Sequence, residues 1–236
     1  MTQPFRQVAT NTILKMSNIE LTYRIHDLLL TTATSYDCLS NAIWNGGITR
    51  AKHFLNWKVP LDFADENPEN ACKTHAVSSG LDTRQTVVLM TAAKLTHASV
   101  HQTKQSSFSI LCLATAGTSN AVRAGKARKT YPSYVAGTVN VTVLINAKMT
   151  SAAIANALIT STEAKAAALI DAGIPDQSNG LLATGTTTDA VVIGCSQSND
   201  WPHIHRYAGT ASELGHAIEM LVYQSVLESV TTQHDD

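Results

Sequence analysis

The chain has 236 residues, of which 44% are hydrophobic and 15% charged, and its formal net charge is -1 at pH 7. This content is enough for one sizeable core, so we expect a single domain over residues 1–236, with its core at about 19–230 and short flexible tails. The near-neutral charge provides no basic field for nucleic acid, and no apolar run is long enough to cross a membrane. Because the N-terminus lacks a signal-peptide pattern, we expect a soluble, cytoplasmic protein.

The N-terminal part predicts strands joined by turns. Residues 19–30 alternate between polar and apolar before becoming apolar, which predicts one strand, or two strands joined by a turn near residue 26. Residues 38–44 predict a further strand. The Asn-Gly-Gly sequence that begins at Asn45 predicts a tight turn with positive φ angles.

The next segments predict short helices. Residues 49–60 carry the apolar residues Ala51, Phe54, Leu55 and Trp57 and favour a helical turn before Pro60. Asn67 as N-cap and Pro68 at the first helical position predict a helix that ends near Gly80.

The middle of the chain gives one ambiguous signal and one clear signal. Asp82 and Gln85 have capping-box spacing, although the apolar residues after them would also suit a strand. We favour a short helix leading into a strand near residues 94–101. Residues 108–114 are continuously apolar and predict a buried strand.

Residues 137–196 predict a strand, a long helix, a loop and a second strand. Residues 138–146 alternate as a half-buried strand does, with Val139, Val141, Val143 and Ile145 on one face. Thr150 is the expected N-cap of the helix, and Gly173 is the expected residue after its last turn. Residues 190–195 are apolar on both faces, as in a central strand. The expected buried stripe of the helix consists of Ile154, Leu158, Thr162, Ala166, Leu169 and Ile170.

A last helix follows Gly209, with an apolar face that includes Leu214, Ile218 and Leu221. Together these elements predict the α/β class: a single domain with an α+β-like mixed sheet packed against helices, built around the central strand–helix–strand unit.

Cysteines and histidines give no metal-binding signature. The four cysteines are widely spaced and form no CxxC pair. Cys112 and Cys195 lie in apolar strand-like runs, so we expect buried, reduced thiols rather than metal ligands. His97 with His101, and His203 with His205, have spacings that two ligands of one ion can share, but neither pair has a third ligand nearby in sequence. We therefore expect solvated histidines and no metal site.

Four turns rich in Gly, Thr, Ser and Asn lie at predicted strand ends, near Asn45, Gly117, Thr138 and Gly185. In open α/β sheets, ligands gather at strand ends, where backbone N–H groups and short polar side chains converge. The pattern favours a polar ligand pocket as much as it favours tight surface turns.

Three residues are candidates for chemistry. Glu163 lies at the edge of the buried helix stripe, which suits either a partly buried general acid or base or a rim charge paired with Lys165 or Lys148. Asp189 precedes a buried strand and either caps the turn or points into a site, with the pattern slightly favouring the cap. Thr138 begins a strand and offers a hydroxyl nucleophile, although threonine is common there.

Six blocks in order take the interpretation further: NGGITRAKHFLNWKVP from Asn45, GLDTRQTVVLMTAA from Gly80, TAGTSNAVRAGK from Thr115, GTVNVTVLINAKMTSAAIANALITSTEAKAAAL from Gly137, ATGTTTDAVVIGCS from Ala183 and YAGTASELGHAIEMLVYQSV from Tyr207. With these blocks the sequence resembles the adenosylcobinamide amidohydrolases of the CbiZ family over most of its length.

The resemblance implies a salvage enzyme that hydrolyses the amide joining aminopropanol to a corrin propionate in adenosylcobinamide, which gives adenosylcobyric acid and 1-aminopropan-2-ol. The partner is then a small-molecule corrinoid. Its cobalt belongs to the substrate, and no separate cofactor or metal is expected. A non-catalytic corrinoid-binding or handover protein is the alternative, and a homo-oligomer is left open.

The family does not dictate the mechanism, so the site residues are hypotheses. Glu163 or Asp189 is the candidate general base, and Thr138 is the alternative nucleophile, by a faint resemblance to the self-processing aminopeptidases of the DmpA and ornithine acetyltransferase fold. Backbone N–H groups at Gly117 or Gly185 are candidate oxyanion donors. The remaining candidate substrate-binding residues are Asn45, Gly46, Asn120, Arg123, Lys126, Asn140 and Thr186.

Overall fold

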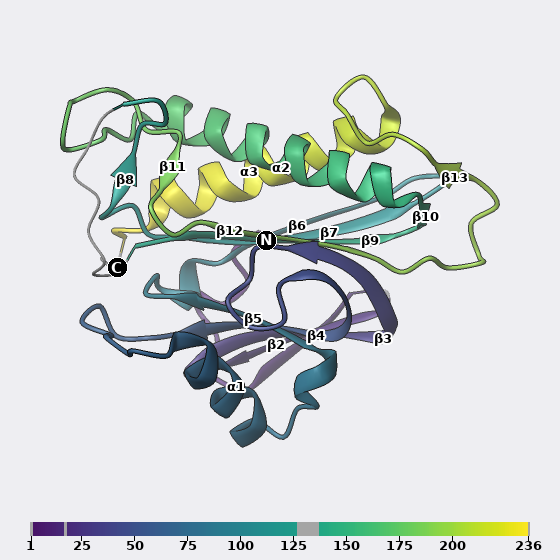
Figure 1. Cartoon of the computed structure of the whole chain (residues 1–236), viewed down its shortest axis with the longest axis horizontal. Helices are drawn as coiled ribbons and strands as arrows, with labels where there is room; N and C mark the ends of the chain where they lie inside the picture. The colour runs from purple at the N-terminus through teal and green to yellow at the C-terminus, as the bar shows by residue number, and fades with distance from the viewer. Residues whose placement is uncertain (1, 17, 127–136, 236) are drawn as a thin grey trace.

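The computed structural model describes residues 2–16, 18–126 and 137–235. In this part of the chain the elements form four layers (Figure 1). Helices α2 (Ser151–Asp171) and α3 (Glu213–Thr232) cover one layer of strands, a second layer packs beneath it, and α1 (Pro68–Ser78) covers the far face of the second layer. This arrangement confirms the predicted α/β class, with a mixed sheet packed against helices.

The strands and short helices are, in chain order, β1 (Thr12–Met16), β2 (Ile19–Arg24), β3 (Asp27–Ser40), β4 (Gly47–Lys58), η1 (Thr83–Gln85), β5 (Thr86–Thr91), η2 (Leu95–His97), β6 (Ser99–Lys104), β7 (Ser109–Ala116), β8 (Ala121–Val122), β9 (Val139–Asn146), β10 (Lys148–Met149), β11 (Gly185–Thr186), β12 (Ala190–Cys195) and β13 (Ile204–His205). Nine of the described strands form one sheet in the order β1-β2-β3-β12-β9-β7-β6, with β4 paired to β3 and β5 paired to β4.

The long strand β3 joins the two layers. Residues 27–32 pair with β2, whereas residues 37–40 pair with β12, and β4 lies along β3 on both stretches. A strand has only two edges, so β2 and β12 share one edge of β3 and diverge from it. The β3–β4 register shifts between Thr31 and Tyr36, which is where a bulge lets the strand bend.

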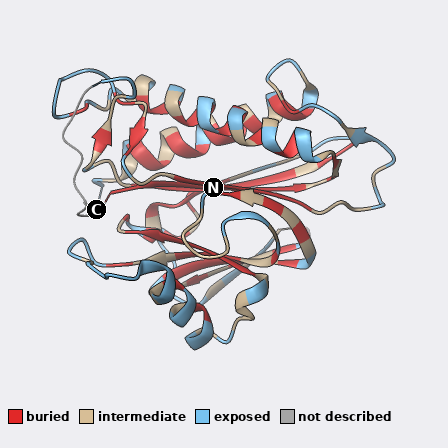
Figure 2. Cartoon of the chain, in the orientation of Figure 1, coloured by how far each residue is buried: buried red, intermediate tan, exposed pale blue. Residues whose placement is uncertain are grey.

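Alternation along the strands explains why the layers stack. On β5, Val87 and Leu89 point between the two layers, whereas Val88 and Met90 pack against α1. On β9, Val139, Val141, Val143 and Ile145 face α2 and α3, and Leu144 faces the other layer. Buried residues therefore run through both layers and along the inner faces of α2 and α3 (Figure 2). The expectation that residues 138–146 are half-buried is wrong, because the second layer covers the other face of β9.

Helix α2 begins and ends where the sequence predicts. The Thr150 hydroxyl accepts a hydrogen bond from the Ala153 N–H at 3.2 Å, and Gly173 has φ +70° after the last turn. The predicted buried stripe is partly wrong. Ile154 and Leu169 are buried, but Thr162 is exposed, and the stripe that faces the sheet consists mainly of small residues: Ala153, Ala157, Thr160, Ser161, Ala164 and Ala168.

Two other local predictions are wrong. Residues 49–60 contain no helical turn, because β4 occupies them and pairs with both β3 and β5. After Asp82 the short helix is only η1, and the apolar residues that follow form β5. Of the two alternatives for residues 19–30, two strands joined by a turn near residue 26 is confirmed by β2 and β3. Helix α1 after Asn67, strand β7 and the apolar face of α3 are also confirmed.

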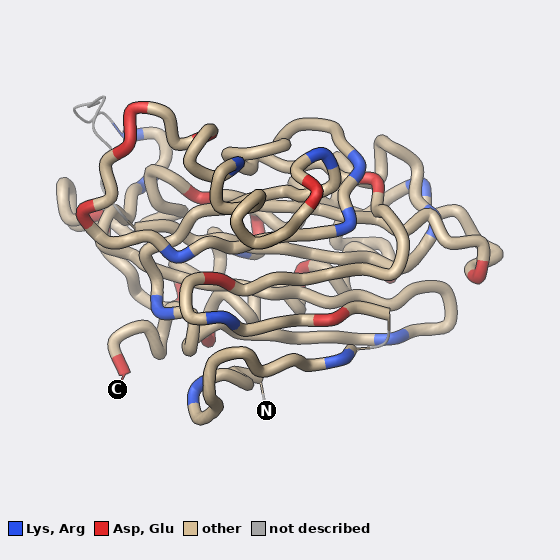
Figure 3. The backbone as a smooth tube through the Cα atoms, turned by 90° about the horizontal axis from the view of Figure 1, so that it is seen from below, with Lys and Arg blue, Asp and Glu red and all other residues tan. Residues whose placement is uncertain are grey.

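Charged residues of both signs are interspersed along the backbone (Figure 3). No helix in the described part of the chain is long and apolar enough to cross a membrane. All four cysteines are free and buried, as predicted.

Candidate active site

Strand direction brings three of the four predicted polar turns to one end of the layer beneath α2 and α3. Strand β12 runs parallel to β9, so both strands begin at the same end, and the antiparallel β7 finishes there. The turn after β7 therefore meets the starts of β9 and β12. The Gly117 N–H donates to the Thr138 carbonyl at 2.9 Å, and the Val139 N–H donates to the Asp189 carboxylate at 3.0 Å.

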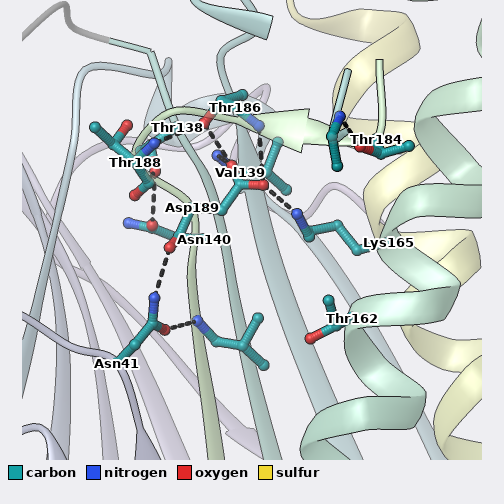
Figure 4. Close-up of polar contacts among 12 residues, drawn as sticks. Asn41, Thr138, Val139, Asn140, Thr162, Lys165, Thr184, Thr186, Thr188 and Asp189 are labelled. Atoms are coloured by element: carbon teal, nitrogen blue, oxygen red, sulfur yellow. Dashed lines mark hydrogen bonds and ion pairs between the residues drawn. The ribbon is translucent and has the colours of Figure 1, made fainter. Parts of the chain in front are cut away.

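The Asp189 carboxylate is the centre of this cluster (Figure 4). Its Oδ1 accepts from the Val139 N–H and from the Thr186 hydroxyl at 2.5 Å, and its Oδ2 accepts from the Thr186 N–H at 3.0 Å and from the Lys165 ammonium. Four donors occupy the four lone-pair sites of a carboxylate. This geometry suits a group that fixes its neighbours, and it argues against Asp189 as a general base.

Lys165 comes from α2, and its side chain is only 6% exposed. Sequence reasoning treated this lysine as a partner for Glu163 at the helix rim. In the structure it lies on the sheet-facing side of α2, with Ser161 and Ala164 as buried neighbours. Gly185 leaves room for the ion pair, because a Cβ there would lie 2.7 Å from Asp189 Oδ2 and 2.9 Å from Lys165 Nζ.

Thr138 lies beside the ion pair and is 2% exposed. Its hydroxyl is 2.8 Å from the Thr188 carbonyl and 3.1 Å from Asn140 Oδ1, so its one proton has two candidate acceptors. The preceding carbonyl, of Gly137, accepts from the Thr188 hydroxyl at 2.5 Å and lies 3.3 Å from the Thr186 hydroxyl, whose one proton is closer to Asp189 Oδ1. Gly137 has φ +155°, a conformation that side-chain-bearing residues rarely adopt.

Asn140 ties the two layers together. Its amide nitrogen donates to Asn56 Oδ1 on β4 and to the Met90 carbonyl on β5, both at 2.8 Å. Asn56 in turn donates to the Thr115 hydroxyl on β7 at 2.8 Å. Because Asn140 is buried and its amide is engaged in this network, the structure places it beneath the site rather than on a substrate-facing surface.

A ribbon of β8 and β11 lies next to the cluster. Asn120, just before β8, donates to the Thr187 hydroxyl at 2.6 Å, and Arg123 after it donates from its backbone N–H to Asp176 at 2.9 Å. Hydrogen bonds to the Asp176 carboxylate, the most important from the Ser178 hydroxyl and the next from the Arg123 N–H, lower the pKa of Asp176 from 3.8 to about 2. The Arg123 side chain donates to the Leu182 carbonyl at 3.2 Å, and Lys126 is exposed.

Comparisons with known proteins assign the chain to a family. The model of the adenosylcobinamide amidohydrolase family matches residues 13–236. The chain belongs to this family. An adenosylcobinamide amidohydrolase from Methanosarcina mazei is 30% identical over 210 residues, which cover 86% of this chain and 94% of the relative. One from Halobacterium salinarum is 29% identical over 216 residues, which cover 89% and 87%.

Among solved structures, a β-aminopeptidase from Burkholderia sp. matches with a TM-score of 0.43 and 7% identity, and covers 98% of this chain and 86% of that chain. A likeness this distant carries no argument about mechanism. The resemblance to self-processing aminopeptidases therefore stays a hypothesis.

Several candidate residues of this adenosylcobinamide amidohydrolase family member lie outside the cluster. Glu163 is exposed on α2, which rules out the alternative of a partly buried carboxylate. Lys165, one of its two candidate partners as a rim charge, pairs with Asp189 instead. Asn45 donates to the carbonyls of Arg84 and Thr86, and Gly46 follows it in the turn before β4. Arg128 and Lys129, which extend the basic segment of Arg123 and Lys126, lie outside the described residues.

Two residues of the cluster were not anticipated. Lys165 is one, and Asn41 is the other: it donates to the Asp189 carbonyl at 2.7 Å and accepts from the Val191 N–H at 2.8 Å. Asn41 follows β3 directly, so the only sequence signal was a polar residue at a strand end. For Lys165 the signal was its spacing from Ala157, Ser161 and Ala168, which marks the close-packed side of α2.

The structure does not assemble a metal centre from the described side chains. Across the described ranges, no group of three or more His, Cys, Asp or Glu residues is arranged to hold an ion. The expectation of solvated histidines is wrong for His97, which is buried in η2, and burial lowers its pKa.

Proposed function

We propose that this protein hydrolyses the amide that joins aminopropanol to a corrin propionate in adenosylcobinamide, giving adenosylcobyric acid and 1-aminopropan-2-ol. Membership of the amidohydrolase family supports the reaction class. The buried Lys165–Asp189 pair, held where the starts of β9 and β12 meet, is the observation that supports this location for the chemistry. The reaction adds one water and changes no oxidation state, so the proposal includes no separate cofactor and treats cobalt as part of the substrate.

Lys165 has the properties needed to stabilise the transition state. Amide hydrolysis builds negative charge on the carbonyl oxygen, and a fixed cation in a water-poor site stabilises that charge strongly. Asp189 accepts one of the three ammonium protons, which fixes the position of Nζ. In this proposal Lys165 contacts the substrate oxygen, and Asp189 is a positioning residue.

The attacking group is either a water or the Thr138 hydroxyl. Asp189 has its lone pairs occupied and Glu163 lies on the outside of α2, so neither is suited to activate a water in this structure. Thr138 is one residue from the N–H that binds Asp189, and its hydroxyl belongs to the same cluster. An acyl-enzyme trapped on Thr138 distinguishes the two routes.

The deciding experiment is mass analysis of the products after incubation of the purified protein with adenosylcobinamide. The proposal predicts release of 1-aminopropan-2-ol and adenosylcobyric acid in equal amounts. The alternative, a corrinoid-binding or handover protein, predicts binding of adenosylcobinamide without release of aminopropanol, even with a large molar excess of substrate and a long incubation.

The proposed location of the reaction is the cytoplasm. Four free, buried cysteines support a reducing compartment, because oxidising compartments favour disulfides.

A further inference from the structure

A cavity of about 580 Å³ lies beside the first turns of α2, away from the Lys165–Asp189 pair. Strands β3 and β4 supply Leu39, Ile48 and Arg50 to its wall, and α2 supplies Ile154 and Ala155. Ile48 is 91% exposed, which is unusual for a large aliphatic side chain. The volume lies within the range of small-molecule sites.

One flank of α2 runs from this cavity toward Lys165. Ser151 and Ala155 line the cavity, and Leu158, Thr162 and Lys165 follow them at alternating spacings of three and four residues. Residues at this spacing share one helix face, and the rise of 1.5 Å per residue gives the face a length of about 21 Å. Thr162 lies one turn from Lys165 in Figure 4.

The end of β3 faces this flank over about 13 Å, because strand residues rise by about 3.3 Å each. Asp37 and Leu39 line the cavity, and Asn41 follows at the same alternation. Leu39 packs with the core beneath α2, which shows that this face of β3 points toward the helix. Asn41 ends the row with its hydrogen bonds to the Asp189 carbonyl and the Val191 N–H.

The chemical character changes along these two walls. At the cavity end the walls present the apolar residues Ile48, Leu39, Ile154 and Ala155 beside the Asp37–Arg50 ion pair. The other end carries Asn41, Thr162 and the Lys165–Asp189 pair. A corrinoid amide has a matching polarity, because its flat conjugated ring has apolar faces and its amide side chains project from the rim. Ligand sites commonly combine such an apolar wall with a few fixed polar groups.

We propose that the cavity beside residues 151–155 of α2, together with the flank of α2 from there to Lys165 and residues 37–41 at and just after the end of β3, forms a groove that binds the corrin ring of the substrate. The ring lies against Ile48, Leu39 and Ala155, and the propionate amide extends along α2 to Lys165. This inference rests on the proposed function, since it names where the bulk of that substrate is bound.

The test is to fill the cavity end of the groove and measure corrinoid binding directly. Ala155→Trp places a large ring in the groove, whereas Ala167→Trp places the same ring at another exposed position of the same helix, about 120° around its axis from Ala155. We expect Ala155→Trp to raise the Kd and KM for adenosylcobinamide by about tenfold or more, and Ala167→Trp to leave both near wild-type values. Melting temperatures show whether each variant is folded.

A second variant protects the test against a folding defect in Ala155→Trp. Ile48→Glu changes an exposed side chain at the rim, removes apolar surface and adds a charge. Weaker corrinoid binding with an unchanged melting temperature supports the groove. Wild-type binding by both folded variants overturns it.

The groove and the proposed function fail separately. If the wild type hydrolyses adenosylcobinamide and both variants bind it with wild-type affinity, the groove proposal is wrong and the proposed function stands. Binding by the wild type without hydrolysis, and its loss in Ala155→Trp and Ile48→Glu, removes the function and keeps the groove as a corrinoid site. A wild type that neither binds nor hydrolyses adenosylcobinamide removes both.

Discussion

Lys165 is a buried cation whose described partner is the carboxylate of Asp189. Lys165→Met keeps most of the side-chain volume and removes the charge, so we expect kcat/KM for adenosylcobinamide to fall by about 100-fold or more. Because the substitution leaves Asp189 with its three uncharged donors, we expect the variant to fold. Steady-state kinetics and a urea titration measure the two effects.

The matched control for this prediction is Lys104→Met, at an exposed position on β6. We expect it to leave kcat/KM unchanged. Asp189→Asn tests the positioning role: if Asp189 acts through Lys165, the double variant is no slower than Lys165→Met alone. Activity within threefold of wild type in Lys165→Met contradicts the assignment.

Thr138 gives a prediction that separates the two mechanisms. If its hydroxyl is the nucleophile, Thr138→Val abolishes turnover and retains corrinoid binding, Thr138→Ser restores part of the rate, and a quenched wild-type reaction contains an acyl-enzyme. If water attacks, no acyl-enzyme accumulates. The turnover of Thr138→Val then falls only as far as the lost hydrogen bonds of the hydroxyl disturb the neighbouring residues. Mass spectrometry of the intact quenched protein distinguishes these outcomes.

At the residue scale, the sequence predicted the groups at strand ends better than the group on the helix. The parallel strands β9 and β12 begin at one end of the sheet, and this brings together Thr138, Asn120 and Asp189. The convergence could be predicted because the order of elements indicates the strand directions. The role of Lys165 was not readable, because a lysine on a helix is normally solvated and only three-dimensional packing shows which side is covered. Asn140 lies next to Thr138, as its position on the predicted strand indicates, but the sequence does not reveal the second layer of strands that buries it.

At the scale of elements, the β8–β11 ribbon depends on Asp176. Its carboxylate accepts from the Arg123 N–H and from Ser178, and the pKa of Asp176 is lowered from 3.8 to about 2. The unfolded chain therefore takes up this proton first as the pH falls, so the stabilising contribution is present above about pH 4 and is lost toward pH 2.

The corresponding prediction concerns the acid limb of the stability curve. Asp176→Asn should reduce stability at neutral pH and flatten its decline between about pH 4 and pH 2, because the linked proton is absent. Urea midpoints across this pH range measure the difference from wild type. Asp62→Asn, at an exposed loop position, is the control and should leave the slope unchanged.

Errors in the predicted elements have a common physical cause. The sequence predicts a helical turn in place of β4 because Phe54 faces the other layer while Leu55 faces α1, so both faces of the strand are apolar and no alternation remains. The stripe of α2 was misplaced because alanines allow close packing on the sheet, while the larger Ile159 is exposed. Hydrophobicity identified the elements, and side-chain size decided how they pack.

At the scale of the whole molecule, burial in the layered core suppresses ionisation of the four cysteine thiols. It raises the pKa of Cys38, Cys72 and Cys112 to about 12 and that of Cys195 to about 11. Because the thiolate is the reactive form, we expect the folded protein to react negligibly with a thiol-specific disulfide reagent at pH 8. All four thiols should react after denaturation in guanidinium chloride. Rapid labelling of the folded protein contradicts this prediction and shows that the layers around the labelled cysteine separate under native conditions.

The position of β12 between β3 and β9 has a consequence for biosynthesis. Ser40 pairs with Val192, roughly 150 residues later in the chain, so β3 leaves the ribosome long before its partner is translated. Until then residues 37–40 of β3 and the facing edge of β9 have open hydrogen-bonding groups, which are templates for pairing with other chains. Nascent chains that stall before residue 190 should therefore need a chaperone, and the insertion of β12 should be the late step that completes the sheet.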